Sequence, residues 1–173
     1  VNLLSQTVIF TENFNDEIGL QKISYGEWRI FNGRLYQNDA DSALAKINLA
    51  VPQSGTMQYE FSVKYEKGGF EDRHAGFGIH VFVDQAWNGK SWGNGNSFLL
   101  WLNYDENPSY GSAGFQAQIY KSTSPSTMTL VGEFDLNKFT ALLSSANAGF
   151  EIPIRMKVNS SNGSVWIEDP TMS

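Results

Sequence analysis

The chain has 173 residues, no cysteine and a net charge of −6, and 17% of its residues are charged. This acidic balance, without a cluster of Lys and Arg, argues against nucleic acid as the main partner. The lack of cysteine excludes disulfides and thiolate metal sites. The sequence has no run of about 18 apolar residues, so it predicts no membrane span. The 16 glycines, 12 phenylalanines, 7 tyrosines and 5 tryptophans favour a β-rich fold.

The length predicts a single domain over residues 1–173. The chain starts at Val1 without a basic segment followed by an apolar one, which fits a mature chain or an excised domain. Its turn-rich segments are polar, aromatic and rich in Gly, Asn and Ser. We therefore expect an extracellular, periplasmic or cell-surface location in a bacterium.

The first part of the chain predicts a series of strands. Residues 7–14 form the first of them. Residues 28–37 carry Asn32-Gly33 between two alternating arms, and this dipeptide tolerates the positive φ of a type I′ hairpin turn. Further strands are expected at residues 45–49 and 57–65. The second of these alternates apolar and polar residues, which is typical of an antiparallel strand with one buried face.

Three later stretches, residues 75–84, 97–105 and 114–120, also alternate with a period of two. Each stretch has an aliphatic face and, opposite it, a mixed polar and aromatic face. In the first stretch, Phe82 and Asp84 are predicted to lie on the mixed face. If the three strands are neighbours, the mixed face presents the following residues together: His80, Trp101, Asn103, Gln116, Gln118 and Tyr120. Rings and hydrogen-bonding groups on one surface are the chemistry that a sugar-binding groove needs.

The last part of the chain predicts strands at residues 127–134, 152–158 and 164–168, with one short helix at 136–147 that Asn137 caps. About ten strands separated by turn signals indicate an all-β fold. We expect an antiparallel β-sandwich or jelly roll of two curved sheets with one short helix.

The order and character of several segments carry a resemblance to a known superfamily. They are Phe10-Thr-Glu-Asn-Phe14, Trp28 with Asn32-Gly33-Arg34-Leu35, the strands at 57–65, 75–83 and 97–105, and the late pair at 155–158 and 164–167. The chain resembles the concanavalin A-like lectin and glucanase superfamily, including bacterial laminin G-like jelly rolls. The resemblance implies a structural Ca²⁺ near the first and last strands, held by Glu12 and Asp169, and Asn13 is a further candidate ligand.

Two tryptophans lie in a loop, at residues 84–96, instead of a strand. Trp87 and Trp92 either extend the predicted sugar-binding face or fold back over it, since exposed large aromatic residues need a partner. Trp28 and Trp166 are expected to pack in the core, whereas Trp101 could do either.

The spacing of the acidic residues argues against a glycosidase. The resembling glucanases carry Glu-x-Asp-x-x-Glu or Glu-x-Asp-x-Glu on one strand, whereas Glu133-Phe134-Asp135 has no third acid at the right spacing. A polysaccharide lyase is a second enzymatic possibility, with His80 as neutraliser or base, Tyr120 or Tyr104 as acid and Arg73 as carboxylate clamp. In jelly-roll polysaccharide lyases the histidine lies in a Gln-Ile-His pattern, and this chain has Gly78-Ile79-His80 instead.

Oxygen-rich clusters at residues 38–41 and 105–107 are alternative cation sites, and the composition argues against zinc. The leading hypothesis is a noncatalytic carbohydrate-binding or surface-recognition domain. Its ligand would be a glycan or polysaccharide, or a surface protein, and the site would be the mixed face with Trp87 and Trp92. The alternatives are a structural or protein-interaction jelly roll of a surface assembly and, behind it, the lyase.

Overall fold

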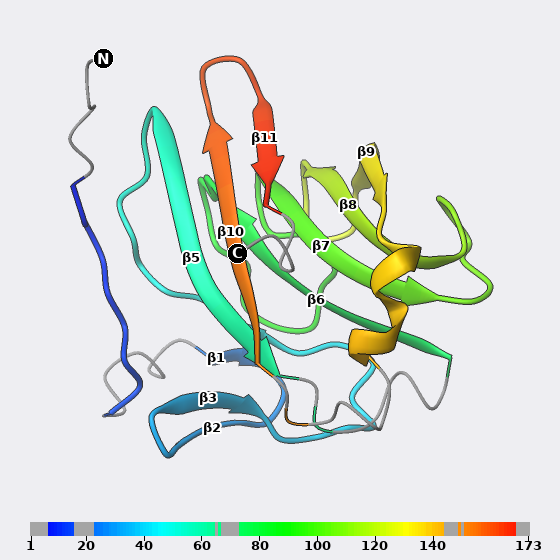
Figure 1. Cartoon of the computed structure of the whole chain (residues 1–173). Coiled ribbons are helices and arrows are strands. Elements are labelled where there is room, and N and C mark those ends of the chain that lie inside the picture. The colour runs from blue at the N-terminus through cyan, green and yellow to red at the C-terminus, as the bar shows by residue number, and fades with distance from the viewer. Residues whose placement is uncertain are drawn as a thin grey trace, which may run out of the picture. The chain divides into compact units, whose positions relative to one another are not determined.

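A computed structural model describes residues 7–15, 23–64, 66, 73–143, 149 and 151–168 (Figure 1). The described residues contain eleven strands: β1 (Ile23–Tyr25), β2 (Trp28–Phe31), β3 (Arg34–Gln37), β4 (Lys46–Ile47), β5 (Thr56–Lys64), β6 (His74–Val81), β7 (Ser97–Asp105), β8 (Gly114–Ser122), β9 (Met128–Asp135), β10 (Glu151–Asn159) and β11 (Ser164–Ile167). All the strand pairs are antiparallel. The predicted all-β, antiparallel fold is therefore confirmed.

The chain contacts divide into two compact units, Val1–Pro52 with Asn88–Lys90, and Gln53–Trp87 with Ser91–Ser173. The first unit holds two small sheets, β1 with β4 and β2 with β3. The turn between β2 and β3 places Asn32 at φ 50° and Gly33 at φ 66°, as a type I′ hairpin requires. The predicted hairpin is confirmed, and the single domain over 1–173 stays a prediction.

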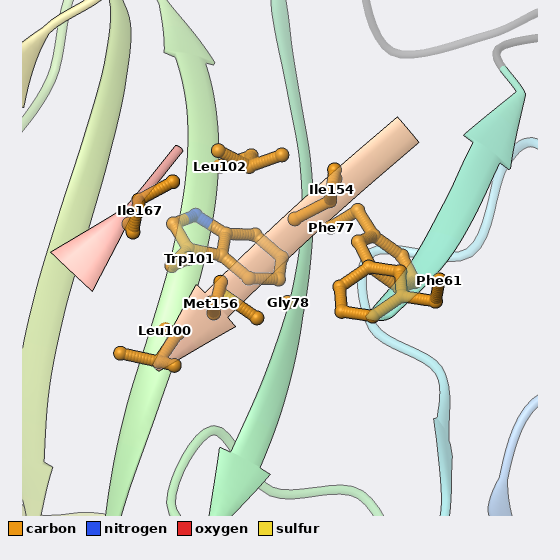
Figure 2. A pocket seen from close by; sticks show the side chains of 9 residues that line it. All are labelled: Phe61, Phe77, Gly78, Leu100, Trp101, Leu102, Ile154, Met156 and Ile167. Atoms are coloured by element: carbon orange, nitrogen blue, oxygen red, sulfur yellow. The ribbon is translucent and has the colours of Figure 1, made fainter. Parts of the chain in front are cut away.

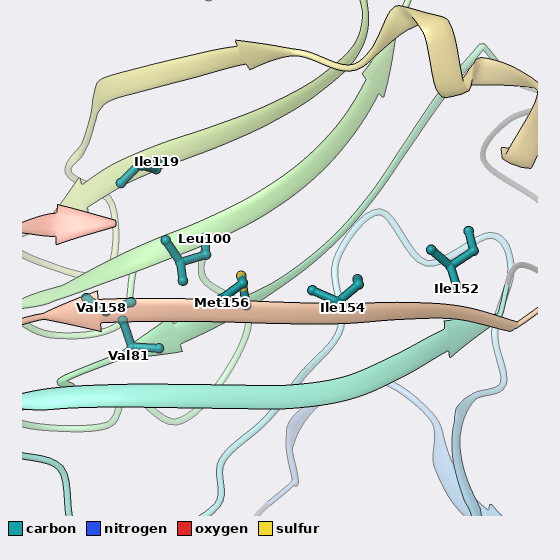
Figure 3. Packing of buried hydrophobic residues seen from close by; sticks show 7 residues of the cluster. All are labelled: Val81, Leu100, Ile119, Ile152, Ile154, Met156 and Val158. Atoms are coloured by element: carbon teal, nitrogen blue, oxygen red, sulfur yellow. The ribbon is translucent and has the colours of Figure 1, made fainter. Parts of the chain in front are cut away.

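The second unit is a β-sandwich. Its sheets have the strand orders β6-β7-β8-β9 and β11-β10-β5. One core cluster joins both sheets: Val81, Leu100 and Ile119 from the first, with Ile152, Ile154, Met156 and Val158 from β10 (Figure 3). Strand β10 alternates strictly between exposed and buried residues, so its whole inner face enters this core. Each such side chain contributes about 1.5–3 kcal/mol when fully buried.

The predicted helix is a 3-10 helix, η2 (Asn137–Leu143), and residues 144–148 lie outside the described part of the chain. Its Phe139 packs with Tyr104 and Phe115 in a second core cluster. The expected cap, Asn137, instead accepts a hydrogen bond from Phe115 N on β8, while Asp135 Oδ1 accepts one from Asn137 N. Asp135, the last residue of β9, therefore holds the backbone at the start of the helix, and Asn137 ties the helix to the sheet.

Other expectations about local structure were wrong. Residues 7–14 form no strand, and β4 spans only two residues. Strand β6 ends at Val81, because Phe82 has a positive φ of 55° that interrupts the alternation. As a result the Phe82 side chain packs against the core cluster and not on the mixed face. Among the described residues, no helix is both long and apolar enough to cross a membrane.

Candidate functional site

The outward face of the four-stranded sheet is the side turned away from the sandwich core. The strand register sets its residues in rows across β6, β7, β8 and β9. One row holds Gly76, Asn103, Gln116 and Asp135, the next Gly78, Trp101, Gln118 and Glu133, and a third His80, Leu99, Tyr120 and Leu130. The three strands predicted to be neighbours are therefore neighbours, and the six residues of the predicted mixed face share this outward face.

Trp101 lies across two glycines of the edge strand β6. A Cβ atom on Gly76 would be 1.9 Å from Trp101 Cζ2, and one on Gly78 would be 2.7 Å from Trp101 Cε3. The indole therefore occupies the space that side chains at these two positions would take. Its Nε1 donates a hydrogen bond of 3.1 Å to Asn103 Oδ1, which fixes the orientation of the ring.

The loop at residues 84–96 adds a third ring beside Trp101 and Tyr120. The ring centroid of Trp92 is 4.9 Å from that of Trp101 and 5.8 Å from that of Tyr120, at interplanar angles of 86° and 78°. These edge-to-face arrangements are favourable for aromatic pairs. All three side chains are partly exposed. We call Trp92, Trp101 and Tyr120 the aromatic cluster.

Backbone hydrogen bonds hold the same loop against the end of β8 and the turn that follows. Asn94 N donates to Ser122 Oγ (3.0 Å), Ser122 Oγ donates to Gly95 O (2.8 Å), and Gly93 N donates to Pro125 O (2.9 Å). Asn94 is 2% exposed. These contacts place Trp92 beside Trp101 and Tyr120, and both alternatives for the role of the loop in binding stay predictions.

Asp84 closes the base of this loop. Its carboxylate accepts hydrogen bonds from Asn96 Nδ2 (2.5 Å), Asn96 N (2.8 Å) and Gln85 N (2.6 Å). The hydrogen bonds from the side chain and the backbone of Asn96 lower the pKa of Asp84 from its usual value. The carboxylate therefore holds the two ends of the loop together.

His80 fastens the loop to β6. Its Nε2 lies 3.2 Å from the carbonyl oxygen of Trp92, and its Nδ1 lies 2.9 Å from Ser97 Oγ. Because a carbonyl oxygen only accepts, the neutral ring carries its proton on Nε2, and Nδ1 accepts from the Ser97 hydroxyl. This geometry assigns His80 the role of positioning Trp92.

A hydrogen-bond network runs from the aromatic cluster to β9. Tyr120 Oη donates to Gln118 Oε1 (3.1 Å), and Gln118 Nε2 donates to Glu133 Oε1 (2.8 Å). Glu133 also accepts hydrogen bonds from Ser112 N (2.9 Å) and Ser112 Oγ (2.8 Å). Burial alone would raise the pKa of Glu133, but the hydrogen bonds from Gln118 and Ser112 outweigh it, so this pKa is lowered.

This lowered pKa makes the network sensitive to acid. We expect Glu133→Gln to destabilise the protein by less than about 1 kcal/mol at pH 7, since the carboxylate is partly exposed. A carboxylate whose pKa is lower in the folded than in the unfolded chain stabilises the fold above the unfolded value, about 4.3, and this stabilisation is lost as the pH falls through the folded value. Urea unfolding at pH 7 and pH 3 measures the change. A difference between wild type and variant that stays constant over this range contradicts the prediction.

The predicted site residues thus fall into two groups. Trp92, Trp101, Tyr120 and Asn103 are partly exposed, whereas Gln116 is 2% and Gln118 is 1% exposed. Both glutamines are therefore covered: Gln118 joins Tyr120 to Glu133, and Gln116 Nε2 donates a hydrogen bond to Ala113 O (3.3 Å). Trp87 is 47% exposed, and the ring contacts of the cluster are made by Trp92.

The expectation that Trp166 packs in the core was wrong. Trp166 is 51% exposed, because β11 alternates and turns Val165 and Ile167 to the core instead. Trp28 is half-buried, and its Nε1 donates a hydrogen bond to Tyr25 O (3.0 Å).

The two acids of β9, Glu133 and Asp135, both accept hydrogen bonds from neighbouring residues. Glu133 and Asp135 share the outward face, but a glycosidase needs one carboxyl group whose pKa is raised. The pKa of Glu133 is lowered, and Asp135 Oδ1 accepts the hydrogen bond from Asn137 N. Both carboxylates therefore accept hydrogen bonds within the protein, and the lack of retaining glycosidase activity stays a prediction from the sequence.

The residues considered for a lyase do not converge. Tyr104 is buried on the core side of β7 and donates a hydrogen bond to Glu106 Oε1 (3.0 Å), which also pairs with Arg73 (3.6 Å from Nε to Oε2). Arg73 precedes the first residue of β6 and His80 lies near the other end, so the strand between them, His74 to His80, alone spans about 20 Å at roughly 3.3 Å per residue. A base and a carboxylate clamp at that separation cannot act on one sugar unit.

The predicted Ca²⁺ ligands are only half visible, since Asp169 lies outside the described residues. Glu12 Oε1 accepts a hydrogen bond from Phe14 N (2.8 Å). In the described part of the chain, no group of three or more His, Asp and Glu residues could hold a metal ion. Asp39 and Asp105, from the alternative clusters, accept hydrogen bonds from the backbone two residues ahead. Such turns need no cation.

A small cavity inside the sandwich has an apolar lining (Figure 2). Its walls are formed by Phe61, Phe77, Gly78, Leu100, Trp101, Leu102, Ile154, Met156 and Ile167. Phe61 and Phe77 are neighbours there, with ring centroids 5.7 Å apart. The cavity belongs to the core and offers a sugar no carboxylate, amide or hydroxyl group.

Residue-by-residue reasoning missed three contributors to the site: Ser112, Gly76 and Gly78. The two glycines could have been recognised from the sequence. Glycines two residues apart in a strand lie on the same face, and there they leave room for the ring of a tryptophan on the neighbouring strand. Ser112 carried none, since its contact with Glu133 joins residues that are far apart in the sequence.

No family model, curated protein or solved structure matches the chain. The resemblance to the concanavalin A-like superfamily stays a prediction from the sequence. Arguments about function therefore rest on the side chains of the outward face.

Proposed function

We propose that this chain is a noncatalytic carbohydrate-binding domain that holds its glycan at the aromatic cluster. The observation that carries the proposal is the convergence of three partly exposed rings from a loop, β7 and β8. Aromatic rings stack on the apolar faces of sugars, and neighbouring amide and hydroxyl groups bind their hydroxyls. Asn103, beside Trp101, supplies an amide at this position.

The proposal divides the site residues by role. Trp92, Trp101 and Tyr120 would contact the sugar rings, and Asn103 would bind a hydroxyl group. His80, Gln116 and Gln118 would hold these groups in place. Preorganisation of this kind reduces the conformational entropy that is lost on binding.

The wider setting is proposed from the sequence alone. We expect an extracellular, periplasmic or cell-surface protein of a bacterium, and Ca²⁺ at Glu12 and Asp169 is a structural ion that calorimetric titration can detect. The concanavalin A-like relationship is part of the same proposal.

A glycan array followed by affinity electrophoresis tests the function. With the polysaccharide that the array identifies, we expect Trp101→Ala and Trp92→Ala each to weaken binding by about tenfold or more, since one stacked ring contributes on the order of 1 kcal/mol or more. Trp166→Ala is the matched control, because it removes an exposed tryptophan from the other sheet. Binding that survives both cluster variants eliminates the proposed site.

The exposed Trp166 favours a second candidate function, a protein-interaction or structural jelly roll. Trp166 stands on the outer face of the β11-β10-β5 sheet, directly opposite Lys157. If size-exclusion chromatography shows an oligomer that Trp166→Ala dissociates, and no glycan binds, this second function replaces the first.

A further inference from the structure

The outward face of the four-stranded sheet carries acids but no fixed cation. The carboxylates of this face in the described strands are Asp105, Glu133 and Asp135. No described lysine or arginine occupies an outward position in β6 to β9.

Two nearby cations do not lie on the outward face. Arg73 precedes β6 and pairs with Glu106 at 3.6 Å. Lys121 alternates with Tyr120 and so occupies an inward position on β8.

The negative charge of Glu133 is felt at the aromatic cluster. Glu133 is joined to Tyr120 by only two hydrogen bonds, through Gln118. The pKa of Tyr120 is raised, first by burial and further by the charge of Glu133. A ligand bound on the cluster therefore lies within about one Debye length of this carboxylate at physiological salt, roughly 8 Å.

We infer that the aromatic cluster accepts uncharged glycans and disfavours glycans that carry carboxylate or sulfate groups. This inference rests on the proposed function. A uronate or sulfate stacked beside Trp101 would meet like charge from Glu133, and no lysine or arginine of β6 to β9 occupies an outward position to compensate. A neutral sugar meets no such repulsion, and its hydroxyls can donate hydrogen bonds to the carboxylate oxygens.

Biolayer interferometry with matched polymers tests the inference. The probes are hydroxyethylcellulose, barley β-glucan, glucomannan and xylan, each compared with its own carboxymethylated form. At an ionic strength of about 0.01 M, where the Debye length is about 30 Å, we expect the neutral form to bind about fivefold to tenfold more tightly. Near 1 M salt, where the Debye length is about 3 Å, this preference should largely vanish.

Charge variants locate the effect. Asp135→Asn with Glu133→Gln should reduce the low-salt preference for the neutral polymer severalfold. The preference is measured as the ratio of the two affinities, so any loss of binding common to both polymers cancels. Asparagine retains the capping oxygen at the start of η2. Glu60→Gln is the control, because it removes one negative charge from the other sheet. It should change neither affinity.

The possible failures are distinguishable. Equal affinity for a polymer and its carboxymethylated form at low salt overturns the charge inference and leaves the binding function intact. An equal effect of Glu60→Gln also overturns it, because the repulsion would then come from the total charge of the protein. Binding of none of these polymers and of no glycan on the array overturns the proposed function, and the inference with it.

Discussion

Replacement of Gly78 with alanine is expected to destabilise the protein by about 1–3 kcal/mol and to displace Trp101. A Cβ atom at this position would lie 2.3 Å from the backbone oxygen of Leu100 and 2.7 Å from Trp101 Cε3. The indole can rotate away, but the carbonyl oxygen belongs to the neighbouring strand and moves only with it. Chemical denaturation measures the loss of stability, and near-ultraviolet circular dichroism reports the displaced ring.

Gly132→Ala is the matched control for this prediction. Gly132 lies in β9, where an added Cβ would meet Ile119 Cδ1 at 3.6 Å and Ile119 Cβ at 3.9 Å, both ordinary contacts. Alanine should be neutral there or stabilising by about 0.5–1 kcal/mol, since it restricts the unfolded chain. Equal stability changes for Gly78→Ala and Gly132→Ala would show that Trp101 does not rest on β6 as described.

The second large effect concerns the core. Leu100→Ala should lower the free energy of unfolding by about 2–5 kcal/mol, because Leu100 is 2% exposed and lies in the cluster that joins the two sheets. Thermal and urea unfolding measure the change. Below the melting temperature glycan binding should persist, since Leu100 faces the core.

The control for the core prediction is Leu49→Ala. Leu49 is 37% exposed, and its truncation should cost about 0.5 kcal/mol or less. A small effect of Leu100→Ala, similar to that of Leu49→Ala, would mean that the two sheets do not pack through this cluster.

Much of the sandwich could be predicted because strand alternation is a local signal. The stretch 97–105 matches β7 at both ends, and Asn32-Gly33 specified the β2-β3 hairpin without help from distant residues. The partner of each strand is also predictable where consecutive strands form a meander, as β6 to β9 do.

Local signals failed where a distant contact or an unusual dihedral angle decides the outcome. Residues 7–14 have the composition of a strand, but a strand also needs a partner, and none of the eleven described strands pairs with them. The positive φ of Phe82 turns its ring from the expected face to the core. Trp166 is a different case. The alternation of β11 indicates an exposed position for Trp166, and it is a better predictor of exposure here than the size of the side chain.

The candidate site shows the same division. Register follows from alternation, so the common face of His80, Trp101 and Gln118 was predictable. The exposure of a side chain on that face was not predictable, because single contacts determine where the covering loops lie. Ser122 holds the loop that brings Trp92 to the cluster, and Ser112 occupies the carboxylate of Glu133.

The indole N–H signals in a two-dimensional ¹⁵N NMR spectrum test the central claim most directly. The chain has 5 tryptophans, so 5 such signals are expected, and Trp→Phe variants assign them. Titration with the glycan found on the array should shift the signals of Trp92 and Trp101 and leave those of Trp28 and Trp166 in place. Shifts confined to Trp166 or Trp28, with Trp92 and Trp101 unmoved at saturation, would contradict a binding site on the outward face.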